Sequence, residues 1–303
     1  MQRFENAVAI VTGGGMGLGE ALSEELGRRG ATVVIADIDA DAARRVAGRL
    51  VQAGKPAVAV PVDVANEIEV AQLIENTVAE YGRVDYMVNN AGIAIGGDSR
   101  DLSMQQWRRV LDVDLLGVVH GSVHAYQFMA RQGHGHIVNI SSLSGLVPQP
   151  GNAAYCTSKH GIVGLSLSLR AEGADLGVKV SVACPGDMKT KIYDNMVVVN
   201  MPHEKVATLS RRTHYLMPQM SAQAAARAIL RGVDRNRPLI VFPAVVQVIW
   251  QLYRRFPGLF YRINIHRMRL FRGLRPTSGD GAVAGGVATS DRSGRRSDTR
   301  RSF

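Results

Sequence analysis

Apolar runs alternate with amphipathic stretches along residues 1–245 of the chain. Short β-branched and apolar runs predict strands, and longer polar stretches with apolar residues at helical spacing predict helices. The predicted strands cover residues 8–11, 32–36, 57–60, 86–88, 137–140, 179–183 and 239–242, and the predicted helices cover residues 20–29, 67–81, 103–130, 154–176 and 222–232. This alternation is typical of a parallel sheet with helices on both faces. We therefore expect an α/β fold.

The pattern changes after this region. Residues 186–220 are rich in methionine and polar residues without a clear period, which suits a flap over a substrate site. Residues 246–275 form an apolar and aromatic extension that contains many arginines. Residues 276–303 consist mainly of Gly, Ala, Ser, Asp and Arg, and this composition predicts a disordered basic tail.

The net charge of +10 comes from the C-terminal quarter of the chain. Residues 231–303 hold 15 Arg, no Lys and 4 Asp, whereas the preceding residues are nearly neutral. Within residues 243–272 the arginines are interleaved with aromatic residues, as in helices that lie at a membrane interface. Peripheral membrane contact and packing within the protein or against another subunit are both open for this segment. Nucleic-acid binding is disfavoured, because the tail lacks aromatic base-stacking elements.

The cysteines and histidines indicate neither a disulfide nor a metal site. Cys156 and Cys184 give neither a disulfide framework nor metal-ligand spacing, and the N-terminus shows no secretory signal, so we expect a cytoplasmic protein. His120 and His124 lie four positions apart on a predicted helix. Because no third ligand is evident nearby, we expect them to pack against the protein or a subunit and expect no metal site.

A glycine-rich turn follows the first predicted strand. In "TGGGMGLG" (residues 12–19), Gly13, Gly17 and Gly19 precede the first helix. Such a turn lets the backbone approach a pyrophosphate at the positive end of a helix dipole. The spacing differs from the general dinucleotide fingerprint G-x-G-x-x-G. A glycine-rich loop without a ligand is therefore the alternative.

An acidic residue favours the dinucleotide interpretation. Asp37 ends the second predicted strand, about 20 residues beyond the glycines, where a carboxylate can accept a hydrogen bond from an adenosine ribose 2′-OH. A 2′-phosphate would meet this negative charge, and neither Met16 nor Ile38 supplies a compensating cation. We therefore expect NAD(H) rather than NADP(H).

A tyrosine and a lysine lie four positions apart in "YCTSK" (residues 155–159). On a helix, Tyr155 and Lys159 would point to the same side. An ammonium beside a phenol favours the phenolate and lowers its pKa from about 10. Because this spacing also arises by chance, the remaining motifs must decide whether the pair is functional.

Six motifs occur in order along the chain: "TGGGMGLG" (12–19), "DV" (63–64), "NNAG" (89–92), "NISS" (139–142), "YCTSK" (155–159) and "PGDMKT" (185–190). Together they resemble the short-chain dehydrogenase/reductase family over roughly residues 5–245. The resemblance implies a single Rossmann-type catalytic domain over residues 1–245, with a doubly wound sheet of about seven parallel strands. It also implies an enzyme that oxidises alcohols or reduces carbonyls with a nicotinamide cofactor.

The resemblance assigns roles to individual residues. Ser142 would hydrogen-bond the substrate oxygen, Tyr155 would act as the acid/base, and Lys159 would bind the nicotinamide ribose and lower the pKa of the tyrosine. This fits the chemistry, since alcohol oxidation needs a hydride acceptor and a base. The implied NAD-binding residues are Gly13, Met16, Gly17, Leu18, Gly19, Asp37, Asp63, Val64, Asn90, Ala91, Gly92, Tyr155, Lys159, Pro185, Gly186, Met188 and Thr190.

One position departs from the family pattern. Asp114 in "LDVDLLG" stands where such proteins usually carry Asn, a residue associated with a helix kink and with a water that leads to the lysine. Asp keeps an acceptor, loses the amide donor and brings a charge close to Lys159. Three interpretations remain open: a tolerated substitute, a proton relay with altered pH dependence, or an impaired enzyme.

Substrate and partners are less closely defined. The methionines in and around residues 186–220 favour a hydrophobic secondary alcohol or ketone, such as a lipid, steroid or terpenoid, although flap residues that simply pack on the core have the same composition. The resemblance implies a homo-oligomer, a dimer or tetramer, paired through the helices at 103–130 and 155–172. A dinucleotide-binding, membrane-associated scaffold or sensor with weak catalysis is the alternative function.

Overall fold

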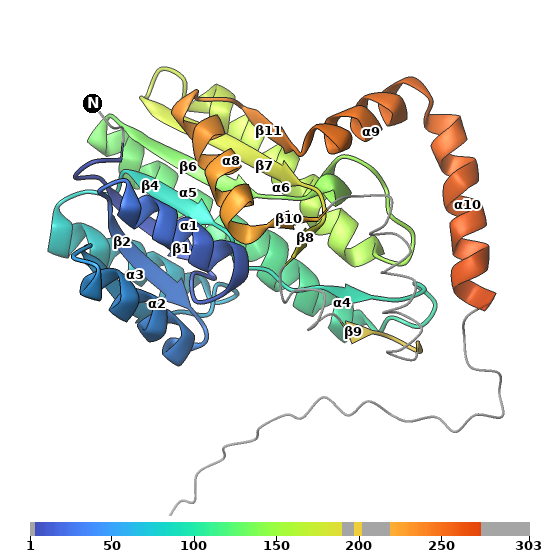
Figure 1. Cartoon of the computed structure of the whole chain (residues 1–303), viewed down its shortest axis with the longest axis horizontal. Coiled ribbons are helices and arrows are strands. Elements are labelled where there is room, and N and C mark those ends of the chain that lie inside the picture. The colour runs from blue at the N-terminus through green and yellow to red at the C-terminus, as the bar shows by residue number, and fades with distance from the viewer. Residues whose placement is uncertain (1–3, 190–196, 202–218, 274–303) are drawn as a thin grey trace, which may run out of the picture.

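A computed structural model describes residues 4–189, 197–201 and 219–273 of the chain. Seven strands pair in parallel in the order β11-β7-β6-β4-β1-β2-β3 (Figure 1). Their bounds are β1 Val8–Thr12, β2 Thr32–Asp37, β3 Ala57–Pro61, β4 Tyr86–Asn89, β6 Gly135–Ile140, β7 Val178–Pro185 and β11 Leu239–Phe242. The α/β fold class and the seven-stranded parallel sheet are confirmed.

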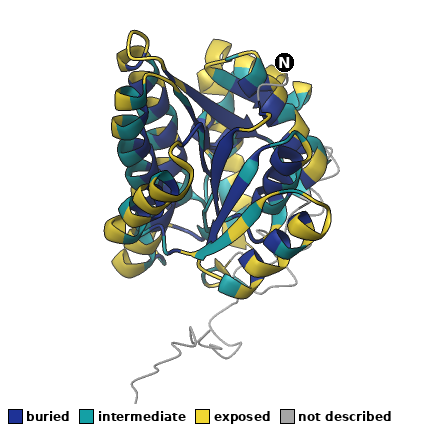
Figure 2. Cartoon of the chain, turned by 90° about the vertical axis from the view of Figure 1, so that its left-hand side faces the viewer, coloured by how far each residue is buried: buried dark blue, intermediate teal, exposed yellow. Residues whose placement is uncertain are grey.

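Helices cover both faces of the sheet, with buried strands between helices whose outer sides are exposed (Figure 2). One face carries α1, α2 and α8, and the other carries α3, α5 and α6. The helical bounds are α1 Gly17–Arg28, α2 Ala40–Gln52, α3 Glu67–Tyr81, α4 Met104–Leu111, α5 Gly117–Gln132, α6 Ala153–Glu172, α8 Ala222–Asp234, α9 Ala244–Arg255 and α10 Pro257–Gly273. Short turns η1 (Asp112–Leu116, π-helical) and η2 (Leu143–Gly145, 3₁₀) lie between them.

Within the described residues, four two-residue strands lie outside the main sheet. β5 (Ile95–Gly96) pairs with β9 (Val197–Val198), and β8 (Met188–Lys189) pairs with β10 (Met220–Ser221). Most of the predicted flap, including Thr190, lies outside the described residues, and so does the predicted tail from residue 276.

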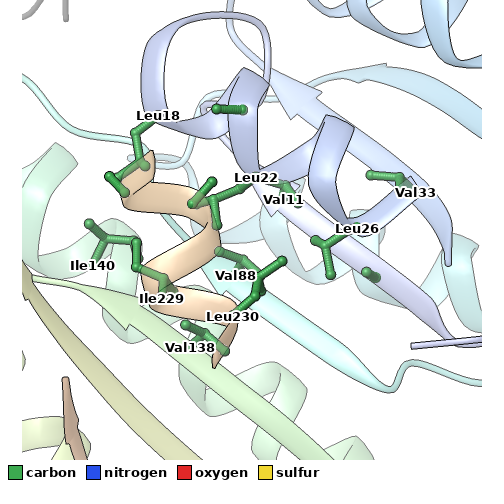
Figure 3. Packing of buried hydrophobic residues seen from close by; sticks show 14 of the residues in the cluster. Val11, Leu18, Leu22, Leu26, Val33, Val88, Val138, Ile140, Ile229 and Leu230 are labelled. Atoms are coloured by element: carbon green, nitrogen blue, oxygen red, sulfur yellow. The ribbon is translucent and has the colours of Figure 1, made fainter. Parts of the chain in front are cut away.

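The core explains why α1 and α8 lie side by side. Leu22 and Leu26 of α1 meet Ile229 and Leu230 of α8 above Val88 of β4 (Figure 3). All five side chains are buried. Apolar residues at three- and four-residue spacing line one side of each helix, and burying these sides against the sheet stabilises the layer.

Helix α2 is absent from the sequence-based prediction. The Asp39 carboxylate caps its N-terminus by accepting hydrogen bonds from the Asp41 and Ala42 amides. Its buried side consists of small residues and a few aliphatic ones, including Val46 and Leu50. Because alanines form much of this face, hydrophobic periodicity alone gives a weak signal.

The predicted helix at 103–130 is not continuous. It consists of α4, the π-helical turn η1 and α5, and the predicted helix at 154–176 begins at Ala153 and ends at Glu172. A π-turn adds one residue to the helical repeat and is often found at functional sites. Here the turn contains Asp114, whose side chain is fully buried.

Candidate active site

The glycine turn connects β1 to the N-terminus of α1. Gly13 and Gly17 adopt φ values of +60° and +58°, which residues with a Cβ rarely do. A Cβ on Gly19 would collide with the Gly13 carbonyl oxygen. Met16 is the N-cap residue and makes no side-chain capping bond, so the first amides of α1 have no side-chain acceptor there. Such amides at a helix N-terminus fit a pyrophosphate.

A second loop is tied to this turn. The Asn90 side chain donates hydrogen bonds to the Thr12 and Gly13 carbonyl oxygens, each at 3.0 Å. The Thr12 hydroxyl accepts from the Asn90 and Ala91 amides at 3.0 and 3.2 Å. These residues lie at the carboxyl ends of β1 and β4, between which the strand order reverses. A crevice at that position is where doubly wound sheets bind ligands.

Asp37 lies beside the same turn. Its Oδ2 accepts from the Gly15 amide at 2.8 Å and its Oδ1 from the Asp39 amide at 3.0 Å. The carboxylate is buried and oriented, and each oxygen has a further lone pair for a ligand hydroxyl. Its position fits a nucleoside ribose.

The loop after β3 supplies the "DV" pair. The Asp63 Oδ1 accepts from the Ala65 amide at 3.0 Å, and buried Val64 packs against Gly117. At the other end of the crevice, β7 ends at Pro185, and the Gly186 amide donates to the Phe242 carbonyl at 2.9 Å. Met188 follows in β8. The strand ends thus line up these predicted cofactor residues along one edge of the sheet.

Ser142, Tyr155 and Lys159 are brought together by β6 and α6. Ser142 follows β6, its hydroxyl accepts from the Ser144 amide at 3.2 Å, and its proximity to Tyr155 lowers the pKa of that phenol. Lys159 lies one turn after Tyr155, with Nζ 5.2 Å from the centre of the tyrosine ring. The lysine is buried, and its Nζ donates to the Ile140 carbonyl at 3.4 Å. These contacts hold the Lys159 ammonium close to the Tyr155 ring.

Asp114 forms an ion pair with this lysine. Its Oδ2 is 3.3 Å from Lys159 Nζ, without the geometry of a hydrogen bond, and its Oδ1 accepts from the Ile93 amide at 2.7 Å. The side chains of Asp114 and Lys159 are 0% and 6% exposed. Burial raises the pKa of Asp114, and the lysine charge and the Ile93 amide oppose this. Gly92 lies beside the pair, since a Cβ there would be 3.5 Å from each charged group.

The pKa of Tyr155 depends on opposing effects. Burial raises it, the Lys159 charge lowers it, and the Asp114 carboxylate raises it again. The net direction is upward, so the lysine acts as the four-residue spacing predicted but does not by itself outweigh burial and Asp114. Burial lowers the pKa of Lys159, but the net direction is upward, chiefly because the Asp114 carboxylate lies beside the ammonium, which therefore stays protonated.

Both cysteines and the His120/His124 pair contact neighbouring protein groups. Burial raises the pKa of the Cys184 thiol to about 12, and the Cys156 thiol contacts the Gln149 backbone. His120 Nδ1 is 3.0 Å from the Val64 carbonyl, and His124 lies 3.4 Å from Glu67. Among the described residues, no group of three or more His, Cys, Asp or Glu could hold a metal ion.

Sequence reasoning missed several groups that support the site. Thr12 and the Ile93 amide hold the two loops, and a buried network links Asn89, Ser122 and Asn139 behind them. The only sequence signal is that Asn89 and Asn139 belong to "NNAG" and "NISS", where polar residues interrupt or end apolar strands. The Asn89 side-chain nitrogen and the Asn139 side-chain oxygen are satisfied in this network, whereas the Asn89 side-chain oxygen is buried without a hydrogen-bond partner.

Comparison with known proteins agrees with this geometry. A family model for short chain dehydrogenases matches residues 7–197. The chain belongs to the short-chain dehydrogenase/reductase family. Like its named relatives, this dehydrogenase acts on CH–OH groups. It is 38% identical over 212 residues to cis-4-hydroxycyclohexanecarboxylate dehydrogenase of Sinomonas cyclohexanicum, covering 70% of this chain and 83% of that protein.

Two further similarities extend the comparison. Cyclohexanol dehydrogenase of Acinetobacter sp. is 33% identical over 192 residues, covering 63% of this dehydrogenase and 76% of the relative. A solved structure of a short chain dehydrogenase/reductase from Burkholderia phymatum in complex with NAD superimposes with a TM-score of 0.78 at 28% identity. That superposition covers 86% of this chain and 96% of the other. The fold and the family thus agree in independent comparisons.

Proposed function

We propose that this short-chain dehydrogenase interconverts a hydrophobic secondary alcohol and its ketone with NAD(H). The observation that carries the proposal is the grouping of Ser142, Tyr155 and buried Lys159 at the crevice beside the glycine turn. A proton-transfer group, a polarising hydroxyl and a fixed cation are what alcohol oxidation requires of the protein.

Each of these residues has a defined task. Bound NAD⁺ supplies the acceptor for the hydride that leaves the carbinol carbon. The Tyr155 oxygen takes the hydroxyl proton of the alcohol, while the Ser142 hydroxyl hydrogen-bonds the same substrate oxygen. Lys159 places a positive charge beside the phenol and thereby stabilises the phenolate. In the reductive direction Tyr155 returns the proton to the carbonyl oxygen.

Asp37 supports NAD(H) as the cofactor. Its buried carboxylate, oriented by the Gly15 and Asp39 amides, would repel a 2′-phosphate and accept from a 2′-hydroxyl. We expect Asp37→Ala to lower the ratio of kcat/KM for NAD⁺ over NADP⁺ by about tenfold or more, which corresponds to one charge-assisted hydrogen bond. Steady-state kinetics with both nucleotides measures the ratio. Asp39 caps α2 next to the site, and Asp39→Ala is therefore the matched control. A wild-type preference for NADP⁺ would contradict the assignment.

The substrate class rests on the relatives. The names of the two similar dehydrogenases specify cyclic secondary alcohols. Two of the described flap methionines, Met188 and Met220, pack against the core and therefore say little about substrate. We expect cyclohexanols and other apolar secondary alcohols to reduce NAD⁺ with a higher kcat/KM than polyols, as followed by NADH absorbance. A preference for polyols would contradict the substrate class, and no turnover of any alcohol or ketone would contradict the function.

We also propose that the protein is a homo-oligomer. Leu116 of η1 and Leu167 of α6 are 44% and 42% exposed, on the helices through which the family resemblance implies pairing. Exposed apolar residues on adjacent helices suit a subunit interface. Light scattering after size exclusion should give a dimer or tetramer, and Leu167→Glu should shift it to a smaller species. A monomeric wild type would contradict this.

A further inference from the structure

Helix α10 contacts the protein with one side only. Asn264 donates to the Pro148 carbonyl at 3.1 Å, Arg272 donates to Asp98 at 2.7 Å, and the Phe271 ring lies against Gly151. Figure 1 shows α9 and α10 as an arm along one side of the molecule. Tyr253 and Phe260 join the two helices through an edge-to-face contact at 5.6 Å. The arm therefore has a defined position and a defined outer side.

That outer side of α10 carries exposed apolar residues, with the exposed His266 among them. Leu259, Ile263 and Leu270 are 56%, 44% and 57% exposed. Their spacing of four and seven residues places them on one side of the helix. The half-buried residues Phe260, Asn264 and Phe271 lie on the contacting side. Leu259, Ile263 and Leu270 are called the outer stripe below.

Arginines flank the outer stripe. At 100° per residue, Arg262 and Arg269 fall on one side of it and Arg267 on the other, and all three are exposed. Residues 244–273 contain no Asp or Glu. The stripe is therefore bordered by cations that have no acidic partner within the arm.

We propose that α10 docks on an anionic lipid bilayer, with the outer stripe in the interface and the flanking arginines on lipid phosphates. Apolar residues bordered by arginines are what an interfacial helix needs, because long basic side chains can reach the headgroups while the apolar face is buried. A second copy of the chain is a poorer occupant, since pairing two outer stripes would bring unpaired arginines together. No helix among the described residues is long and apolar enough to cross a membrane.

Flotation of the full chain with vesicles tests the proposal. We expect wild-type protein to float with phosphatidylglycerol/phosphatidylcholine vesicles at low salt and much less with phosphatidylcholine alone. The triple variant Leu259→Glu/Ile263→Glu/Leu270→Glu should lower the bound fraction by about tenfold or more. Ile68→Glu is the matched control, because Ile68 is 67% exposed on α3. The control should float like the wild type.

A second variant separates charge from apolar burial. Arg262→Gln/Arg267→Gln/Arg269→Gln should weaken flotation with the anionic vesicles and remove its sensitivity to salt. Unchanged circular dichroism would show that the variants fold. Three results would overturn the proposal: no flotation of the wild type, equal flotation of the stripe variant, or a stripe variant that instead changes the oligomeric state. In the last case the stripe is an interface between copies.

Discussion

Two aspartates in this dehydrogenase pair with cations, and the consequences are opposite. Asp114 in the active site and Asp98 under the arm are both buried. The partner of Asp114 is the buried Lys159, whereas Asp98 accepts hydrogen bonds from Arg100 and Arg272, which are 60% and 48% exposed. Burial raises the pKa of Asp114, and hydrogen bonds from the arginines lower the pKa of Asp98.

The difference shows that burial of the partner and hydrogen bonding decide whether the pKa of a paired carboxylate is raised or lowered. Arg100 and Arg272 are partly exposed to solvent and donate hydrogen bonds to the Asp98 carboxylate. These bonds stabilise the anionic form of Asp98, which holds α10 against the protein. Asp114 and Lys159 are both buried, so burial and the charge of each partner shift the pKa of the other group, and both charges act on the pKa of Tyr155. The contacts of Asp98 attach α10 to the protein, and the Asp114–Lys159 pair shifts the pKa of Tyr155.

The largest effect is expected from removing the acid/base itself. Tyr155→Phe should lower kcat by about 10²–10⁴-fold, the usual contribution of a general acid or base. NADH binding, followed by its fluorescence, should stay close to that of the wild type, because the buried lysine and the glycine turn are unchanged. A variant that kept more than half of the wild-type turnover would remove Tyr155 from the mechanism.

Asp114→Asn tests the buried pair. The Asp114 carboxylate raises the pKa of Tyr155, so its removal lowers that pKa. Alcohol oxidation needs the deprotonated phenol, and the rate therefore rises with pH through the tyrosine pKa. The rising limb of kcat/KM against pH should move to lower pH, with a rate gain of up to about tenfold for each pKa unit at a fixed pH below it.

The matched control for this variant is Asp112→Asn, which removes a carboxylate from the same π-helical turn. Its pH profile should follow the wild type. If Asp114→Asn left both activity and profile unchanged, Asp114 would be a tolerated substitute for the usual asparagine. If it raised activity and shifted the profile as expected, the Asp114 charge would help to set the pKa of Tyr155, whereas a loss of activity would place the carboxylate in the proton path.

The smallest effect is expected at the arm. Arg272→Gln removes a half-exposed arginine from Asp98, and pairs with an exposed partner contribute up to about 1 kcal/mol. Hydrogen exchange of α10 amides should become faster, while the free energy of unfolding of the core changes little. Arg267→Gln, on the outer side of the same helix, should leave α10 exchange unchanged.

The contact between Asp98 and Arg272 should weaken only at acidic pH. Because its folded pKa is lowered, Asp98 stabilises arm docking above its ordinary pKa of about 4, and the contribution is lost only as the pH falls below that value. Protection of α10, corrected for intrinsic exchange rates, should therefore be constant between about pH 7 and pH 5. If Arg272→Gln instead lowered the free energy of unfolding by several kcal/mol, the arm would be part of the cooperatively unfolding core.

Much of the fold could be predicted from the sequence, because it depends on local patterns. The predicted helix at residues 67–81 matches α3, and the predicted strands fall on the strands of the main sheet. α2 was missed because its buried side is rich in alanine. Hydrophobic spacing does not reveal the π-turn at Asp114, since one residue inserted into a helix leaves almost no mark on it, and only the family resemblance indicates a helix kink at this position.

The sequence by itself determined the α/β alternation, the glycine turn and the side of α6 that Tyr155 and Lys159 share, because each depends on residues close together in the chain. Only the tertiary structure decided the net pKa direction of Tyr155 and the burial of the Asp114–Lys159 pair, because burial depends on strands and helices far apart in the sequence. It also decided which side of α10 faces outward. Dehydration is a property of the packed molecule, and the order of residues does not reveal it.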